Sequence, residues 1–168
     1  RVDLHGTLGK HFVIPALPQF MVRYPDIELS ISEADRQVDL ITEGVDCVLR
    51  GGDSLDDSLV ARPLAMLDQV TCASPDYLKR FGTPQCLADL EGHQMVEYFS
   101  ISNGKRYGLE FVVNDQVQLI DLPKQVSVNS ADGYLAACEA GYGLVQTPYY
   151  HVARQLSEGR LCEVLRTV

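Results

Sequence analysis

The sequence predicts an α/β fold in which strands alternate with helices. The chain has 168 residues of which 46% are hydrophobic, which is ample for a packed core. Short β-branched runs recur between segments of helical spacing. Residues 126–148, VSVNSADGYLAACEAGYGLVQTP, read as strand, helix N-cap, helix, glycine C-cap and strand. Strands separated by helices imply mainly parallel, right-handed βαβ units, in one domain or two small lobes.

The first third of the chain is expected to contain a small set of strands and helices. Apolar residues from Val13 to Tyr24 follow helical spacing, and Tyr24-Pro25 ends that helix. The expected elements, in chain order, are a strand at 2–4, a loop at 5–9, a helix at 10–24, a strand at 27–32, a helix at 36–43 capped by Asp35 and ended by Gly44, and a buried strand at 45–49.

The remainder continues the alternation. Ser74 is the expected N-cap of a helix with Pro75 at its first position and Gly82 just past its end. The other expected elements are strands at 59–64, 68–73, 95–99, 109–113 and 117–122, a short helix at 86–90, a hairpin-type turn at Asn103-Gly104, a helix at 148–157 followed by Gly159, and a strand at 161–164.

The strand-to-helix turn near residue 130 is the most informative local feature. Ser130 can accept a backbone N–H of the first helical turn, and Asp132 lies where the helix dipole favours negative charge. Ala136, Ala137 and Ala140 allow close packing against a neighbouring element. Such a turn presents backbone N–H groups at one edge of a sheet, where open α/β folds bind small molecules, often anions.

Composition excludes several classes of function. A net charge of −9 and a pI of about 4.8 make the chain a poor ligand for phosphate backbones. There is no apolar run long enough to span a membrane. The five cysteines show no CxxC pair and no metal-ligand spacing, which favours reduced thiols and disfavours zinc, with Cys72 and Cys138 expected in the core. The motifs G-x-S-x-G, H-E-x-x-H and G-x-G-x-x-G are missing from the sequence, so we expect neither an enzyme nor a cofactor.

Several blocks of the sequence, taken together, resemble a known family. The blocks are HFVIPALPQFMVRYPDIELSI, LITEGVDCVLRGG, LVARPL, CASPDYLKRFGTP and VNSADGYLAACEAGYGLVQTP. In this order they are similar to the effector-binding domain of LysR-type transcriptional regulators, over essentially all 168 residues. The chain starts at Arg1 within an expected strand, so we interpret it as a regulatory fragment without the family's DNA-binding winged helix-turn-helix and with a trimmed carboxyl end.

The resemblance implies a periplasmic-binding-protein-like fold, in which two Rossmann-like lobes are joined by two crossover strands. Lobe one would be residues 1–71 plus 148–168, and lobe two residues 72–147. The hinge would lie at Thr71, Cys72, Gln146 and Thr147. The effector would bind between the lobes, against Thr7, Leu8, Gly9, Arg50, Gly51, Gly52, Tyr98, Phe99, Ser100, Asn129, Ser130, Ala131, Thr147 and Pro148.

Each of these residues also has a purely structural interpretation. Thr7 could bind an effector oxygen or cap the following helix. Arg50 could clamp a carboxylate or pair with one of the 23 acidic residues of the chain. Asn129 and Ser130 could donate to a ligand or only cap a helix. Gly51 and Gly52 could provide a turn with positive φ, and His93 and His151 are expected to be ordinary polar residues.

The function predicted from these observations is an inducer-sensing, dimerising domain of a cytoplasmic LysR-type regulator. Its partners would be a small effector, which Arg50 would favour as an anion, and a second copy of the chain. In helix 10–24 we expect Val13, Leu17, Phe20 and Tyr24 to face the sheet, and the further apolar residues Phe12, Ile14 and Met21 predict a second partner for this helix. The resemblance implies that this partner is the second lobe of a neighbouring copy, where helix 131–140 would make the contact. The full-length protein would form higher oligomers and bind DNA only through the missing domain. The alternative is a solute-binding protein of a transporter, which the free cysteines disfavour.

Overall fold

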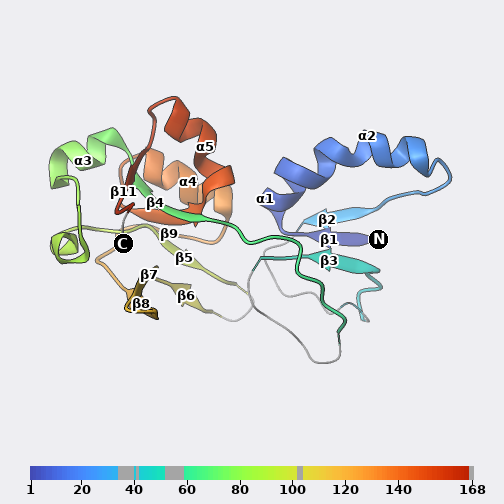
Figure 1. Cartoon of the computed structure of the whole chain (residues 1–168), viewed down its shortest axis with the longest axis horizontal. Helices are drawn as coiled ribbons and strands as arrows, with labels where there is room; N and C mark the ends of the chain where they lie inside the picture. The colour runs from blue at the N-terminus through green and yellow to red at the C-terminus, as the bar shows by residue number, and fades with distance from the viewer. Residues whose placement is uncertain (34–39, 41, 52–58, 102–103, 167–168) are drawn as a thin grey trace. The chain divides into compact units, whose positions relative to one another are not determined.

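The computed structural model describes residues 1–33, 40, 42–51, 59–101 and 104–166 (Figure 1). The chain divides into two compact units, Arg1–Met66 and Leu67–Val168. Both units combine helices with sheets, in agreement with the predicted α/β class. No helix among the described residues is long and apolar enough to cross a membrane.

The first unit is a three-stranded parallel sheet under one long helical run. Strand β1 (Val2–Leu4) lies in the centre, with β2 (Ile31–Glu33) on one side and β3 (Cys47–Leu49) on the other. The helical run consists of α1 (Gly6–Leu8), a π-helical segment (Gly9–Val13) and α2 (Ile14–Arg23), and it lies along one face of the sheet (Figure 1).

Three predictions for this unit are wrong. The loop expected at 5–9 is helical from Gly6 onward. Gly9 has helical φ and ψ values of −54° and −57°, and its N–H donates to the carbonyl oxygen of His5 four residues earlier at 2.9 Å. The strand expected at 27–32 forms only at Ile31–Glu33, where β1 provides a hydrogen-bonding partner. The strand expected to be buried at 45–49 begins at Cys47, which is exposed at the edge of the sheet.

Two further predictions concern the segments on either side of β3. Most of the helix expected at 36–43, with its cap Asp35, lies outside the described residues. The strand expected at 59–64 is wrong, since residues 59–66 have no sheet partner in the described part of the chain. Val60 and Leu64 are exposed there, and Pro63 has no N–H to donate to a neighbouring strand.

The second unit has one antiparallel sheet, one sheet of mixed direction and a hairpin. β4 (Gln69–Ala73) lies between β10 (Val145–Pro148) and β11 (Cys162–Val164), antiparallel to both. β5 (Glu97–Phe99) is parallel to β9 (Ser127–Val128) and antiparallel to β6 (Arg106–Tyr107). β7 (Leu109–Val113) and β8 (Gln116–Ile120) form the hairpin. The helices are α3 (Pro75–Phe81), a 3₁₀ turn (Leu87–Leu90), α4 (Ala131–Glu139) and α5 (Tyr149–Ser157).

The expectation of mainly parallel strands is therefore wrong for the second unit. Residues 148–168 group with residues 67–147 through the pairing of β11 with β4, whereas the predicted lobes join residues 148–168 to residues 1–71; that division into lobes stays a prediction. Of the residues expected at the hinge, Thr71 pairs with Gln146, and Cys72 pairs with Val145. All four expected hinge residues lie in β4 and β10, two neighbouring strands of one sheet.

The predicted helix caps of the second unit are confirmed. Ser74 Oγ accepts the N–H of Tyr77 at 3.3 Å, and Ser130 Oγ accepts the N–H of Gly133 at 3.2 Å. Gly143 follows α4 with φ of 154°, and a Cβ there would lie 2.7 Å from the carbonyl oxygen of Gln94, so only glycine fits. Cys72 and Cys138 are fully buried, as predicted.

Candidate functional site

The first unit brings its predicted site residues to one edge of the sheet. Because β1, β2 and β3 are parallel, their carboxyl ends lie together, and α1 begins at the same edge after His5. Thr7 and Leu8 are buried in the first helical turn. The Thr7 hydroxyl lies 3.0 Å from Nδ1 of His5. Thr7 is inside the helix and His5 occupies the N-cap position without a side-chain cap bond, so the capping interpretation of Thr7 is wrong.

Arg50 directly follows β3 and forms an ion pair with Asp3. Asp3 is buried, with 3% of its side chain exposed, and its other oxygen accepts the hydroxyl of Ser32 at 2.6 Å. Asp3 thus links the central strand to both neighbours. Sequence reasoning allowed an acidic partner for Arg50 but did not identify Asp3; the signal was a carboxylate between two apolar residues of a strand. Gly51 is exposed, and Gly52 lies outside the described residues.

The second unit has a comparable edge. β5 and β9 are parallel. Met95, just before β5, forms a parallel bridge with Leu144, just before β10, so β10 runs in the same direction as β5 and β9. Their carboxyl ends therefore lie together, at the edge where α4 begins. This edge carries the predicted residues Phe99, Ser100, Asn129, Ser130, Ala131, Thr147 and Pro148. Ser100 and Thr147 are buried, whereas Asn129 and Ser130 are exposed.

His151 joins this edge, although we expected it to be an ordinary polar residue. Its Nδ1 lies 3.3 Å from the hydroxyl of Thr147 in β10, and its Nε2 lies 3.7 Å from a carboxylate oxygen of Asp132 in the first turn of α4. The side chain is buried. His151 therefore connects the start of α5 with the start of α4. The sequence offered no local signal for these contacts, because Thr147 lies in β10 and Asp132 lies in a different helix.

Tyr98, also predicted at the site, is held by a hydrogen bond and an aromatic contact. Its hydroxyl donates to the carbonyl oxygen of Asn129 at 3.3 Å, and its ring meets that of Tyr134 edge-on at 5.7 Å between centroids. Tyr134 in turn accepts the backbone N–H of Gln146 at 3.2 Å, and burial raises the pKa of its hydroxyl. These contacts fix the turn after β9.

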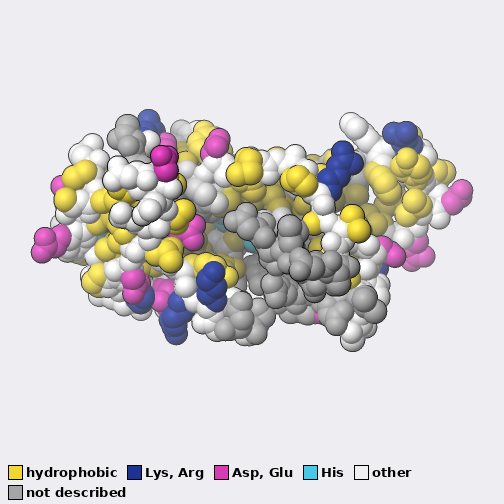
Figure 2. Space-filling model, turned by 60° about the horizontal axis from the view of Figure 1, so that its bottom comes forward, with side chains coloured by type: hydrophobic (Ala, Val, Ile, Leu, Met, Phe, Trp, Pro, Cys, Tyr) yellow, Lys and Arg dark blue, Asp and Glu magenta, His cyan; other side chains and the backbone are white. Residues whose placement is uncertain are grey.

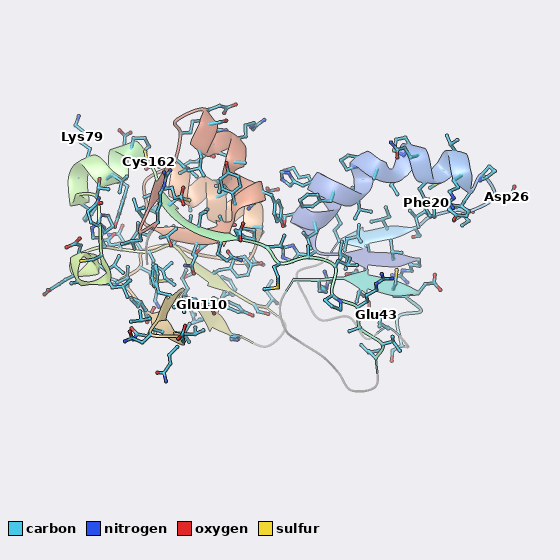
Figure 3. All side chains as sticks on the ribbon, in the orientation of Figure 1. Phe20, Asp26, Glu43, Lys79, Glu110 and Cys162 are labelled. Atoms are coloured by element: carbon cyan, nitrogen blue, oxygen red, sulfur yellow. The ribbon has the colours of Figure 1, made fainter. Side chains whose placement is uncertain are left out.

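Gln146 has a structural role that its expected place at the hinge did not suggest. Its side-chain amide accepts the N–H of Glu110 at 2.8 Å and donates to the carbonyl oxygen of the same residue at 2.7 Å. It also donates to the Thr71 hydroxyl at 3.3 Å. The side chain thus binds β7 as a neighbouring strand would, and it attaches the hairpin to the sheet of β4 and β10 (Figure 3 labels Glu110 on β7).

A buried carboxylate supports the second edge from within the sheet. Glu97, in β5, is 1% exposed and forms ion pairs with the Lys124 ammonium, at 2.8 Å, and with the Arg106 guanidinium. It also accepts a hydrogen bond from the Ser127 hydroxyl at 2.8 Å. Burial alone would raise the pKa of Glu97, but these donors outweigh it and lower the pKa. Asp121 and Glu97 raise the pKa of Lys124. The cluster joins β5, β6 and the segment leading to β9.

The chemistry available at both edges is hydrogen bonding. Among the described residues, no group of three or more His, Cys, Asp or Glu side chains could hold a metal ion. A surface pocket of about 280 Å³ lies elsewhere in the second unit, lined by Arg80, Phe81, Gln94, Gln125, Ala140, Gly141 and Tyr142. Arg80 donates to the carbonyl oxygen of Gly141 at 2.6 Å, which is the structural contact expected of a cation at the end of a helix.

Comparison with known proteins finds relatives of the chain among proteins named as transcriptional regulators. The family model described as the LysR substrate binding domain matches residues 1–167. The chain is 41% identical over 165 residues, 98% of its length, to the uncharacterized HTH-type transcriptional regulator YhjC of Escherichia coli strain K12, and it covers 55% of that protein. An uncharacterized HTH-type regulator of Haemophilus influenzae is 32% identical over 164 residues, 98% of this chain and 56% of that protein. The chain thus spans about half the length of these curated relatives.

Solved structures show the same fold. The CrgA regulatory domain, from a LysR-type transcriptional regulator of Neisseria meningitidis, aligns with a TM-score of 0.79 and 30% identity, over 98% of this chain and 79% of that one. A full-length variant of AphB aligns with a TM-score of 0.81 over 98% of this chain and 56% of that one; at 23% identity, this match supports the fold alone.

Proposed function

This chain belongs to the LysR substrate-binding domain family, and from this premise we propose that it is the part of a longer transcription regulator that senses a small, oxygen-rich effector. The observation that carries the proposal is the convergence of strand ends and a helix start at one edge of each unit. That is where open α/β sheets bind small molecules. The relatives are named as transcriptional regulators, which favours this function over transport or catalysis.

We propose that both edges supply effector contacts. In the first unit these are Thr7, Leu8, Gly9, Arg50, Gly51 and Gly52, and in the second unit Tyr98, Phe99, Ser100, Asn129, Ser130, Ala131, Thr147 and Pro148. Hydroxyl, amide and backbone groups dominate, which suits a ligand rich in oxygen. The effector would act by differential affinity for two conformational states of the regulator, and a coupling of about 1–3 kcal/mol would suffice.

A ligand screen followed by paired substitutions tests this proposal. Small hydroxy acids, sugars and amides are screened for a rise in the melting temperature of the chain, and hits are measured by calorimetry. Thr147→Val should weaken binding of a hit about fivefold, since it removes one hydrogen bond worth roughly 1 kcal/mol. Thr83→Val, on an exposed loop after α3, is the matched control and should leave binding unchanged. If substitutions at both edges leave the affinity for a hit unchanged, the assignment of the site is contradicted.

The first unit also supports self-association. None of the residues of α2 is buried. Val13, Leu17 and Met21 are half-buried, whereas Phe20 and Tyr24, which we expected to face the sheet, are exposed together with Phe12 and Ile14. Figure 2, which turns the bottom of Figure 1 toward the viewer, shows other hydrophobic side chains at the surface of the chain. The helical run adds an exposed apolar face of its own, formed by Phe12, Ile14, Phe20 and Tyr24. We propose that this face binds α4 of a second copy in a symmetric dimer.

DNA binding would reside in a separate segment of the longer protein. The net charge of −9 opposes contact with a phosphate backbone. A gel shift with duplex DNA at low salt, where electrostatic attraction is strongest, should show no complex with this chain. Binding at submicromolar concentration would contradict this part of the proposal.

A further inference from the structure

We infer that Asp3 and Glu33 set the charge preference of the first unit's edge, so that the effector presents a neutral oxygen there, such as a hydroxyl or amide carbonyl, rather than a carboxylate. The inference rests on the proposed function, because it concerns the ligand of the same edge. It assigns to Asp3 and Glu33 the role of specificity-determining residues. Neither residue was part of the site predicted from the sequence.

Arg50 is already paired within the chain. Its guanidinium is the cation among the effector contacts proposed for this unit, and it already forms an ion pair with Asp3. Asp3 is almost completely buried, and Ser32 holds its second oxygen at 2.6 Å. A carboxylate this deeply buried cannot turn away from Arg50 without losing the ion pair that offsets the cost of burying its charge. A ligand carboxylate would therefore meet a guanidinium whose charge is already balanced.

A further carboxylate, that of Glu33, lies at the same edge. Glu33 is the last residue of β2, and its side chain lies so close to α1 that a Cβ on Gly9 would be 2.6 Å from its Oε1. Glu33 is exposed, so its charge is screened but not cancelled. The positive charge of Arg50 is balanced by Asp3, and Glu33 adds a second negative charge. The three side chains together therefore carry a net negative charge. Such an edge disfavours an anion and still offers hydrogen-bond donors to a neutral oxygen.

The experiment compares two small probes that differ in charge but hardly in shape, sodium acetate and acetamide. Each is titrated at constant ionic strength into the ¹⁵N-labelled chain, and the amide signals of Thr7, Arg50 and Gly51 are followed. Asp3→Asn keeps acceptor and donor groups for Arg50 and Ser32 but removes the charge. We expect acetate to bind this variant at least tenfold more tightly than the original chain, while acetamide binds both equally.

Two variants keep the test decisive. Glu33→Gln replaces an exposed carboxylate by an amide of the same shape, and it should tighten acetate binding about two- to threefold even if Asp3→Asn does not fold. Asp26→Asn removes an exposed carboxylate in the turn after α2 (Figure 3) and should have no effect. The inference is overturned if acetate binds the original chain as tightly as Asp3→Asn, if Asp3→Asn weakens it, or if Glu33→Gln leaves it unchanged. These readouts need no natural effector, so they fail independently of the ligand screen that tests the proposed function.

Discussion

The two units bury their side chains very differently. In the first unit the described buried hydrophobic residues are Leu4, Leu8 and Val45, and a carboxylate, Asp3, lies among them. In the second unit two hydrophobic clusters form, one including Tyr77, Met95 and Leu144 and the other Cys72, Tyr134 and Val152. Stability that depends on apolar burial should therefore be concentrated between Leu67 and Val168.

This difference suggests that the two units respond differently to ligands and partners. A unit with a small core and an exposed apolar helix depends on further contacts for part of its stability, and such contacts can be made or lost with ligand and partner. A unit with a large core keeps its shape through such changes. We therefore expect Arg1–Met66 to change its conformation more readily than the second unit does.

The largest effect is expected when a side chain is removed from the second unit's core. Leu144 is fully buried, so Leu144→Ala should lower the free energy of unfolding by about 2–5 kcal/mol through lost burial and a cavity. Leu17→Ala, at a half-buried position of α2, should cost roughly 1 kcal/mol. Urea unfolding followed by circular dichroism, with hydrogen exchange to separate the units, measures both. Equal losses would remove the basis of the comparison.

The next effect concerns the buried carboxylate of the second unit. Glu97→Gln should lower the free energy of unfolding at neutral pH by about 1–3 kcal/mol, because charge-assisted bonds to Lys124, Arg106 and Ser127 weaken. The loss stays in this range because Lys124 and Arg106 remain 30% and 64% exposed and can be solvated. Asp121→Asn, which changes the exposed partner of Lys124, is the control and should cost less.

The same residue predicts a pH dependence with a definite sign. Because the folded-state pKa of Glu97 is lowered, its contribution is fully present above the ordinary glutamate pKa of 4.5 and is lost as the pH falls below it. Measured between pH 7 and pH 3, the stability difference between the original chain and Glu97→Gln should shrink on acidification. A difference that grows on acidification would show that the pKa is raised instead.

Local signals in the sequence predicted the caps and most strands, but tertiary pairing decided the rest. Ser74 and Ser130 cap helices as expected because a capping hydroxyl acts within its own turn. The antiparallel pairing of β10 and β11 with β4 was missed, since pairing direction depends on residues about 70 to 90 positions apart. At the site, Arg50 was identified but Asp3 was not, because their contact spans 47 positions of sequence.

A smaller effect should come from the two helix caps. Ser74→Ala should lower the free energy of unfolding by about 1 kcal/mol, because the N–H of Tyr77 loses its acceptor where water does not easily replace it. Ser130→Ala should cost about 0.5 kcal/mol, since Ser130 is exposed and water can bind the freed N–H of Gly133. Urea unfolding of the two variants gives the ranking, and the reverse order would indicate that water reaches the start of α3 more easily than the start of α4.

The smallest effect on folding, and the clearest contrast, is expected on the exposed face of α2. Phe20 lies near the carboxyl end of this helix (Figure 3), contacts Tyr24 at 5.0 Å between ring centroids, and is exposed. Phe20→Ser should change the free energy of unfolding of a dilute monomer by less than about 0.5 kcal/mol, as other surface changes do. At micromolar concentration the same substitution should weaken the proposed dimer at least tenfold in sedimentation velocity. Val112→Ser, on the exposed face of the β7–β8 hairpin, is the matched control and should leave the dimer intact. If the unsubstituted chain sediments as a single 18.6 kDa species, the exposed face of α2 is not a self-association surface. Contacts other than self-association would then have to supply the stability that the first unit's few buried hydrophobic residues do not provide.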